Sequence, residues 1–140
     1  MSEENVEVLR RMYEAEARGD YAAALALYDP AIEWDNSRSP VGDFAGTVGE
    51  VFRGREAVQQ ALRDWYEAWK IVESEVEELI DAGGESVVSV FTYKAKGRTS
   101  GVEVEFSHMA GTWTIREGKV ARVAWFPTRE AALEAAGLSE

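Results

Sequence analysis

Cysteine is missing from the 140-residue sequence, and histidine occurs once. The first absence excludes disulfides, thiol nucleophiles and thiolate metal sites, and a single imidazole does not make a metal site. Basic residues are few, because 15 Lys and Arg stand against 26 Asp and Glu, and the net charge is −11. Such a chain is repelled by nucleic acid and by anionic membrane surfaces. With no leader-like start and no long apolar run, we expect a cytoplasmic protein.

The length and the 46% hydrophobic content predict a single domain, residues 1–140, with a substantial core. Its first part has helical patterns: a stripe of Val6, Leu9 and Tyr13, and a short helix at 21–28. The pattern of Val58, Leu62, Trp65 and Trp69 then predicts a helix over 55–69. Between them a strand is predicted at 31–35, and polar and glycine residues predict a long loop from Asn36 to Phe52.

Strand patterns fill most of the second half, at 71–81, 86–96, 102–115 and 119–126. A tight turn around Gly118 joins the last two strands into a hairpin, and a short helix ends the chain. Alternation along 102–115 places Phe106 and His108 on the core side, together with Val123 and Trp125 of the return strand. The order of elements predicts an α+β roll, a cone in which a curved antiparallel sheet wraps around the N-terminal helices. Such a cone commonly keeps a pocket at its open end.

Three local patterns carry a resemblance to a known family: Gly19-Asp20 between the first helices, the run 52–58, and the run 113–120. With the order of elements, they resemble the SnoaL-like branch of the nuclear transport factor 2 superfamily. The resemblance implies a cone-shaped fold that hosts ketosteroid isomerases, polyketide cyclases and other enzymes, as well as non-catalytic binders. By resemblance to the ketosteroid isomerases, Tyr13 corresponds in type to a catalytic phenol, and Asp35 corresponds to the carboxylate base. The second acid of those enzymes is absent, since Ala110 takes its place.

The residues themselves suggest acid–base chemistry by Asp35 and His108. A carboxylate that faces an apolar cavity has a raised pKa and can take a proton from carbon beside a carbonyl, while an imidazole stabilises the enolate. Two structural alternatives stay open. Asp35 can begin an Asx-turn instead, and His108 can be a buried neutral histidine with a hydrogen-bond partner.

Two functions are compatible with these patterns. The first is a cofactor-free isomerase, cyclase or lyase that acts on a small apolar carbonyl compound, with no metal. The second is a non-catalytic module that binds a hydrophobic ligand or another protein. The predicted binding residues are the same in both cases: Trp34, Trp65, Trp69, Phe91, Tyr93 and Trp125.

The opposite sheet face is also predicted to be apolar. The same alternation that puts His108 inside puts five large apolar residues outside, namely Met109, Trp113, Ile115, Val120 and Phe126. A face of this kind needs a cover, and a twofold homodimer through the outer sheet face is the predicted cover.

Overall fold

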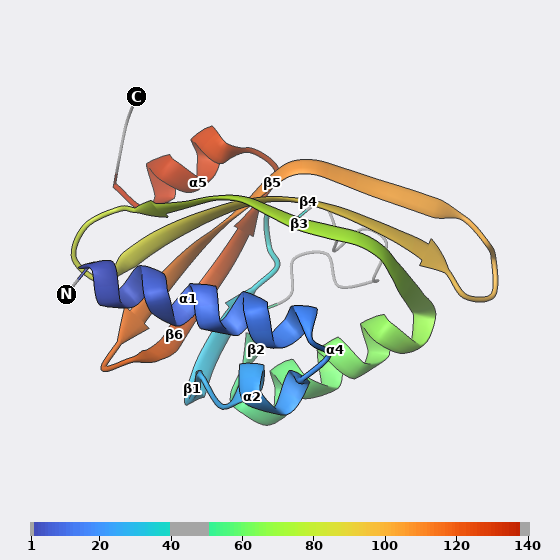
Figure 1. The fold of residues 1–140 in the computed structure, drawn as a ribbon, viewed down its shortest axis with the longest axis horizontal. Helices are drawn as coiled ribbons and strands as arrows, with labels where there is room; N and C mark the ends of the chain where they lie inside the picture. Colours follow the sequence, from blue (N-terminus) through green and yellow to red (C-terminus); the bar gives the residue numbers. More distant parts are fainter. Residues whose placement is uncertain (1, 40–50, 138–140) are drawn as a thin grey trace.

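The computed structural model describes residues 2–39 and 51–137 of the chain. Figure 1 shows the elements in space. The helices are α1 (Ser2–Ala17), α2 (Tyr21–Leu25), α4 (Arg55–Ala68) and α5 (Arg129–Ala135). The strands are β1 (Tyr28–Asp35), β2 (Val51–Arg53), β3 (Trp69–Asp81), β4 (Ser86–Gly97), β5 (Glu103–Arg116) and β6 (Lys119–Phe126).

All the strands join one six-stranded sheet in the order β2-β1-β6-β5-β4-β3. Strands β3 to β6 form the antiparallel run that the sequence predicts, whereas β1 lies parallel to β6. The α+β roll with a curved sheet is therefore confirmed. The predicted loop over 36–52 is wrong at its end, because Val51 and Phe52 pair with β1, and its positions 40–50 lie outside the described residues. The second helix also ends earlier than predicted, at Leu25.

Helices cover the two faces of the sheet unequally. In Figure 1, α1, α2 and α4 lie on one side of the sheet, and α5 lies on the other. Successive side chains of β4 pack on opposite faces of the sheet. Val87 belongs to the hydrophobic cluster with α1 and α4, and Val88 belongs to the cluster with α5. The larger cluster, on the inner side, gathers Leu9, Ile32 and Val58 around the sheet. Since both faces bury apolar side chains, the strands are apolar on both sides over this region.

The outer face is closed by the chain itself where α5 crosses it. Thr128 begins this helix by accepting a hydrogen bond from the backbone N–H of Ala131 at 3.1 Å. The hydroxyl of Thr112 on β5 donates to the carbonyl of Ala132 at 2.8 Å, which ties helix to sheet. Apolar contacts also hold α5 against the sheet, since Leu133 is buried and only 4% exposed.

The structure does not have the predicted apolar patch on the outer face of the sheet. Trp113 and Ile115 are each 1% exposed and belong to the inner core, as Val120 does, while Met109 is also buried. Phe126 does lie on the outer side, but it packs in the cluster under α5. The strand phase that placed these residues outside was wrong, so the argument for a homodimer through this face no longer holds. The homodimer itself stays a prediction.

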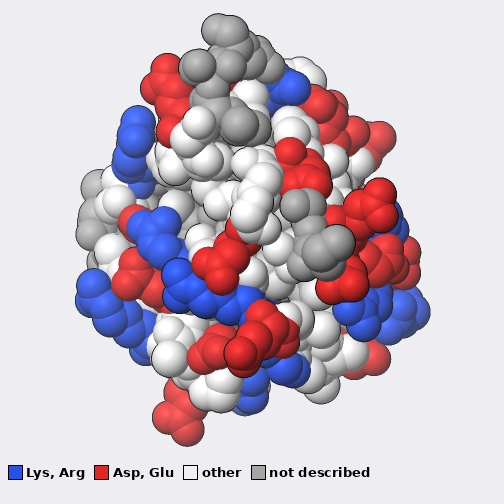
Figure 2. Space-filling view, turned by 90° about the vertical axis from the view of Figure 1, so that its left-hand side faces the viewer, with Lys and Arg blue, Asp and Glu red and all other residues white. Residues whose placement is uncertain are grey.

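The surface carries charges of both signs. Figure 2 shows one end of the molecule, where acidic and basic side chains alternate. Ion pairs join some of the surface charges, for example Arg116 with Glu85 and Arg129 with Glu78, each at 3.0 Å. None of the helices in the described ranges is both long and apolar enough to cross a membrane.

Candidate active site

His108 does not face the core. Two residues of β5, Ser107 and His108, lie opposite the single residue Thr92 of β4, and this bulge reverses the alternation of β5. His108 has a φ of 56°, a left-handed conformation that histidine adopts more often than most residues. Its side chain is 72% exposed, and Nδ1 lies 3.0 Å from the Glu77 carboxylate. The prediction of an inward imidazole was wrong because a bulge without glycine leaves no local sequence signal.

Asp35 lies on the outer side of the sheet as well. Its carboxylate accepts a hydrogen bond from the Ser37 backbone N–H at 2.8 Å, which is the Asx-turn alternative, and another from Arg122 at 2.7 Å. Burial acts to raise its pKa, but the hydrogen bonds from Ser37 and the charge and hydrogen bond of Arg122 outweigh it, so the pKa is lowered. Arg122 also binds Glu33 at 2.9 Å. Asp35 and His108 therefore share no cavity.

The inner side of the sheet does hold a cavity, open at a mouth, which we call the inner chamber. Its volume is about 170 Å³, a little more than a cavity known to hold benzene. Aromatic side chains dominate its wall, and they include Tyr13 and five of the six predicted binding residues. The described lining residues are Tyr13, Glu16, Trp34, Asn36, Ser39, Phe52, Ala61, Leu62, Trp65, Tyr66, Ser74, Phe91, Tyr93, Met109 and Trp125. Trp69 stays outside this wall and stacks on Trp65 at 5.4 Å between ring centroids.

Trp125 lines the chamber and contacts three other aromatic rings. Its ring meets Trp34 at 5.3 Å, Trp113 at 5.2 Å and Phe91 at 5.5 Å, and the last two contacts are edge-to-face. Gly111 makes room for it, because a Cβ there would lie 2.8 Å from the Trp125 ring. The indole N–H of Trp125 is buried and has no hydrogen-bond partner among the described residues. The chamber thus has rigid, flat walls that suit a flat ring.

Tyr13 is fixed in the wall rather than free to react. Its hydroxyl donates to Ser89 Oγ at 3.1 Å, and Trp113 Nε1 donates to the same oxygen at 2.8 Å. Ser89 is fully buried, so the oxygen that both groups share is out of reach of water. Burial also raises the pKa of Tyr13, which keeps its proton in place at neutral pH.

Glu16 is the carboxyl that the sequence analysis missed. It lies one helical turn beyond Tyr13 on α1, and among the described lining residues of the chamber it is the one carboxyl. Within the described residues, no hydrogen bond or ion pair to its oxygens is found. Burial raises its pKa from 4.5 to about 7. A group with this pKa can both take and give a proton at neutral pH.

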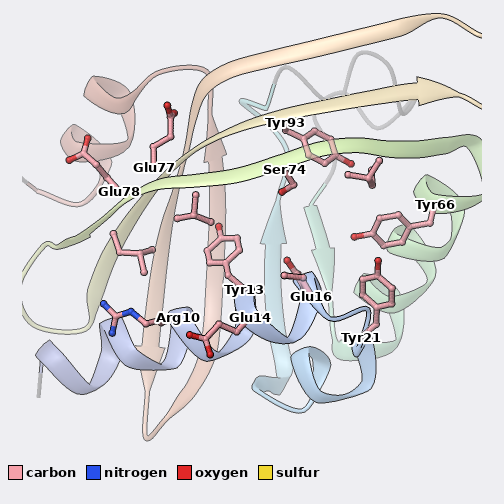
Figure 3. Close-up of a pocket in the computed structure, with 14 residues that line it drawn as sticks. Arg10, Tyr13, Glu14, Glu16, Tyr21, Tyr66, Ser74, Glu77, Glu78 and Tyr93 are labelled. Carbon is pink, nitrogen blue, oxygen red and sulfur yellow. The ribbon is translucent and has the colours of Figure 1, made fainter.

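Glu16 also opens onto a second, larger cavity, the outer groove, of about 600 Å³ between α1 and β3. Figure 3 shows its carboxyl rising from α1 into the space below Ser74, with Tyr13 on one side and Tyr66 on the other. Five residues line both cavities: Tyr13, Glu16, Tyr66, Ser74 and Tyr93. The carboxyl thus stands at the junction between solvent and the aromatic chamber.

Two tyrosine hydroxyls, those of Tyr66 and Tyr93, also lie near this junction. Tyr93 accepts a short hydrogen bond from Trp65 Nε1, which leaves its own hydroxyl proton free to donate. Burial and, next, the charge of Glu16 raise the pKa of Tyr66. Both phenols are therefore neutral donors at pH 7, as the stabilisation of a developing oxyanion requires.

The sequence did contain a signal for Glu16. Leu9, Met12 and Tyr13 form the buried stripe of α1, and position 16 continues it at helical spacing. A carboxylate in phase with a buried stripe is a candidate for a perturbed pKa. In the described ranges there is no group of three His, Asp or Glu residues that can hold a metal ion.

The curved sheet with its helices has the nuclear transport factor 2-like class of fold. The sequence model of the SnoaL-like domain matches residues 9–123, and the chain belongs to this family. A search of curated proteins finds no significant match.

Solved structures agree with this class. An NTF2-like protein of Burkholderia xenovorans is 24% identical, with a TM-score of 0.71 and 97% of each chain covered. TerC, co-crystallised with polyporic acid, is 20% identical, with a TM-score of 0.70 and coverages of 96% and 98%. A Mycobacterium tuberculosis protein in complex with estradiol-17β-hemisuccinate is 14% identical, with a TM-score of 0.71 and coverages of 87% and 92%. At these identities the likeness shows the fold.

Proposed function

We propose that the protein is a cofactor-independent acid–base enzyme that acts on a small, one-ring carbonyl compound in the inner chamber. Glu16 is its proton carrier, in place of the predicted pair Asp35 and His108. The observation that carries the proposal is the Glu16 carboxyl at the chamber mouth, without a partner in the described residues and with a pKa of about 7. TerC and the M. tuberculosis protein were solved with small-molecule ligands, which supports a ligand in this fold.

The reaction is a proton shift. Ionised Glu16 takes a proton from the carbon next to the carbonyl, and the electron pair of that C–H bond moves to the carbonyl oxygen. The Tyr66 hydroxyl donates a hydrogen bond to this oxygen as it becomes an enolate. Protonated Glu16 then returns the proton to another carbon of the same compound, so the net reaction is an isomerisation. The aromatic walls hold the ring flat and exclude water.

The size of the chamber limits the substrate. Since about 170 Å³ accommodates one benzene-sized ring, cyclohex-3-enone is a suitable test compound. Its isomerisation to cyclohex-2-enone is followed by the ultraviolet absorption of the conjugated enone. Deuterium exchange into phenylacetone, followed by proton NMR, detects the first proton transfer alone.

The test compares two isosteric substitutions. We expect Glu16→Gln to lower kcat/KM at least about 100-fold, because general acid–base catalysis contributes about 10² to 10⁴. Asp35→Asn removes a carboxylate on the outer face and should keep the activity. Equal rates in Glu16→Gln and wild type, or a loss confined to Asp35→Asn, would refute the proposal.

A non-catalytic ligand-binding module is the second candidate. It is favoured by the hydrogen bonds already made inside the chamber wall, since Tyr13 is bonded to Ser89 and Trp34 Nε1 donates to Asn36 Oδ1 at 3.0 Å. Fewer polar groups are then left for chemistry. Saturable quenching of tryptophan fluorescence by phenylacetone, with no proton exchange, would select this function.

A further inference from the structure

A third cavity adjoins the mouth of the chamber, at the corner where α4 turns into β3. It is an open hollow of about 540 Å³, which we call the basic hollow. Its described lining residues are Tyr21, Arg63, Tyr66, Glu67, Lys70, Ile71 and Arg98. Tyr66 lines the basic hollow, the outer groove and the inner chamber alike, so one ring borders all three. A ligand that fills the chamber can therefore extend past Tyr66 into this hollow.

The charge of the basic hollow is opposite to that of the whole chain. Three of its residues are cationic and only Glu67 is anionic, although the chain has a net charge of −11. A fourth cation stands beside them, because Lys70 on β3 pairs directly with Lys96 on β4. Like charges at directly opposite positions of a sheet are destabilising. Within the described residues, Arg63, Lys70 and Lys96 form no ion pair, although Glu103 on β5 lies opposite Lys96 on its other side.

Arg98 is held in place for a ligand. Its Nε donates to the backbone carbonyl of Tyr66 at 2.8 Å, and its backbone N–H donates to the carbonyl of Ala68 at 2.9 Å. Among the described residues, the other guanidinium nitrogens of Arg98 have no hydrogen-bond partner, and they form a planar pair of donors whose geometry matches carboxylate and phosphate. Elsewhere on the surface, basic side chains such as Lys94 and Arg122 are each bound to two carboxylates. The corner therefore differs in chemistry from its surroundings.

We propose that the basic hollow binds an anionic group, a carboxylate or a phosphate, carried by the compound whose ring occupies the inner chamber. This rests on the proposed function and adds the class of its substrate, a ring with an anionic tail. The charges that line the outer groove determine which way the anionic tail points. At the other end of that groove, Glu14, Glu77 and Glu78 outnumber one cation, Arg10, which is already paired with Glu7, so an anion is repelled there. The tail thus points toward α4 and the carbonyl stays near Glu16.

Matched ligands test the proposal directly. The carboxylate probe is 3-(4-acetylphenyl)propanoate, its neutral control is the primary amide, and 3-(4-acetylphenyl)propyl phosphate represents the second source of an anion. Dissociation constants come from calorimetry at about 0.01 M salt and again at about 1 M, where the Debye length falls from about 30 Å to about 3 Å. The preferred anion is the one that binds more tightly.

The protein variants are chosen to leave the chamber intact. Arg63→Gln/Lys70→Gln removes two exposed cations of the hollow, and Arg98 is kept because it also holds the Tyr66 backbone. The matched control, Arg11→Gln, removes an exposed cation of α1 that lines none of the three cavities. Unfolding midpoints confirm that each variant is folded.

In wild type we expect an anionic probe to bind about tenfold more tightly than the amide at low salt, the sum of two or three exposed ion pairs. The advantage should disappear at high salt, fall to about twofold to threefold in Arg63→Gln/Lys70→Gln, where Arg98 remains, and persist in Arg11→Gln. Equal affinities of anions and amide in wild type would overturn the inference, as would equal losses in the two variants. The affinity for the neutral amide measures binding in the chamber alone. Loss of proton transfer in Glu16→Gln tests the proposed chemistry. The anion site and the proposed function can therefore be refuted independently of each other.

Discussion

Replacing Glu16 with Gln should change how the stability of the protein depends on pH. A carboxyl whose pKa is higher in the native state than in the unfolded chain binds more protons when folded, between the two pKa values. Folding stability therefore falls as the pH rises from 4.5 through about 7, since partial burial penalises ionisation of Glu16. The amide of Gln has nearly the same shape, carries no charge and escapes this penalty.

The size of the effect follows from the two pKa values. Each pKa unit is worth about 1.36 kcal/mol, so the interval from 4.5 to about 7 corresponds to about 3 kcal/mol. Glu16 is only part-buried, and solvent reduces this value. We expect wild type and Glu16→Gln to be nearly equal in stability at about pH 4, and the variant to be about 2 kcal/mol more stable at about pH 8.

Urea unfolding at a series of pH values measures this difference. The control is Glu14→Gln, which removes a carboxyl from an exposed position of the same helix and so reports the general effect of losing one charge. The informative quantity is the free energy of unfolding of each variant minus that of wild type. A difference for Glu16→Gln that stays flat from about pH 4 to about pH 8, or that matches Glu14→Gln, would refute the buried-carboxyl argument.

Three further changes should have local effects. Gly111→Ala places a Cβ 2.8 Å from the Trp125 ring, so we expect about 1 to 3 kcal/mol of destabilisation in urea unfolding and weaker calorimetric binding of phenylacetone. Arg122→Gln leaves the carboxylate of Asp35 without its cation; stability at neutral pH should fall by about 1 kcal/mol while enone isomerisation is unchanged. Leu9→Ala opens a cavity in the inner core and should cost about 2 to 5 kcal/mol of unfolding free energy.

Much of the fold follows from local sequence patterns. The stripe of α1, the helix after Gly54 and the hairpin turn at Gly118 depend on neighbours in sequence, and periodicity and turn residues reveal them. Gly118 indeed has a φ of 76°, as a tight turn needs. Side-chain alternation was less reliable, because it depends on strand pairing that is set far away in the chain.

In the candidate site, too, some features could be predicted from local sequence and others depend on distant parts of the chain. The aromatic wall with Trp34, Trp65 and Trp125 was predicted from residue type and pattern, and these three residues line the chamber. The proposed catalytic residue, Glu16, was not predicted. The sequence patterns pointed to His108 and Asp35 instead, but a bulge turns His108 away from the chamber and Asp35 lies on the outer side of the sheet. Glu16 follows from the stripe of α1 only once a carboxyl on a buried face is treated as a signal.

The pH dependence of cyclohex-3-enone isomerisation tests the central claim most directly. The profile of kcat/KM reports the pKa of the base in the free enzyme. We predict a rate that rises with pH and reaches half its maximum near pH 7, the pKa of Glu16, and that is absent in Glu16→Gln. A midpoint near 4.5, or the same profile in wild type and Glu16→Gln, would contradict the account.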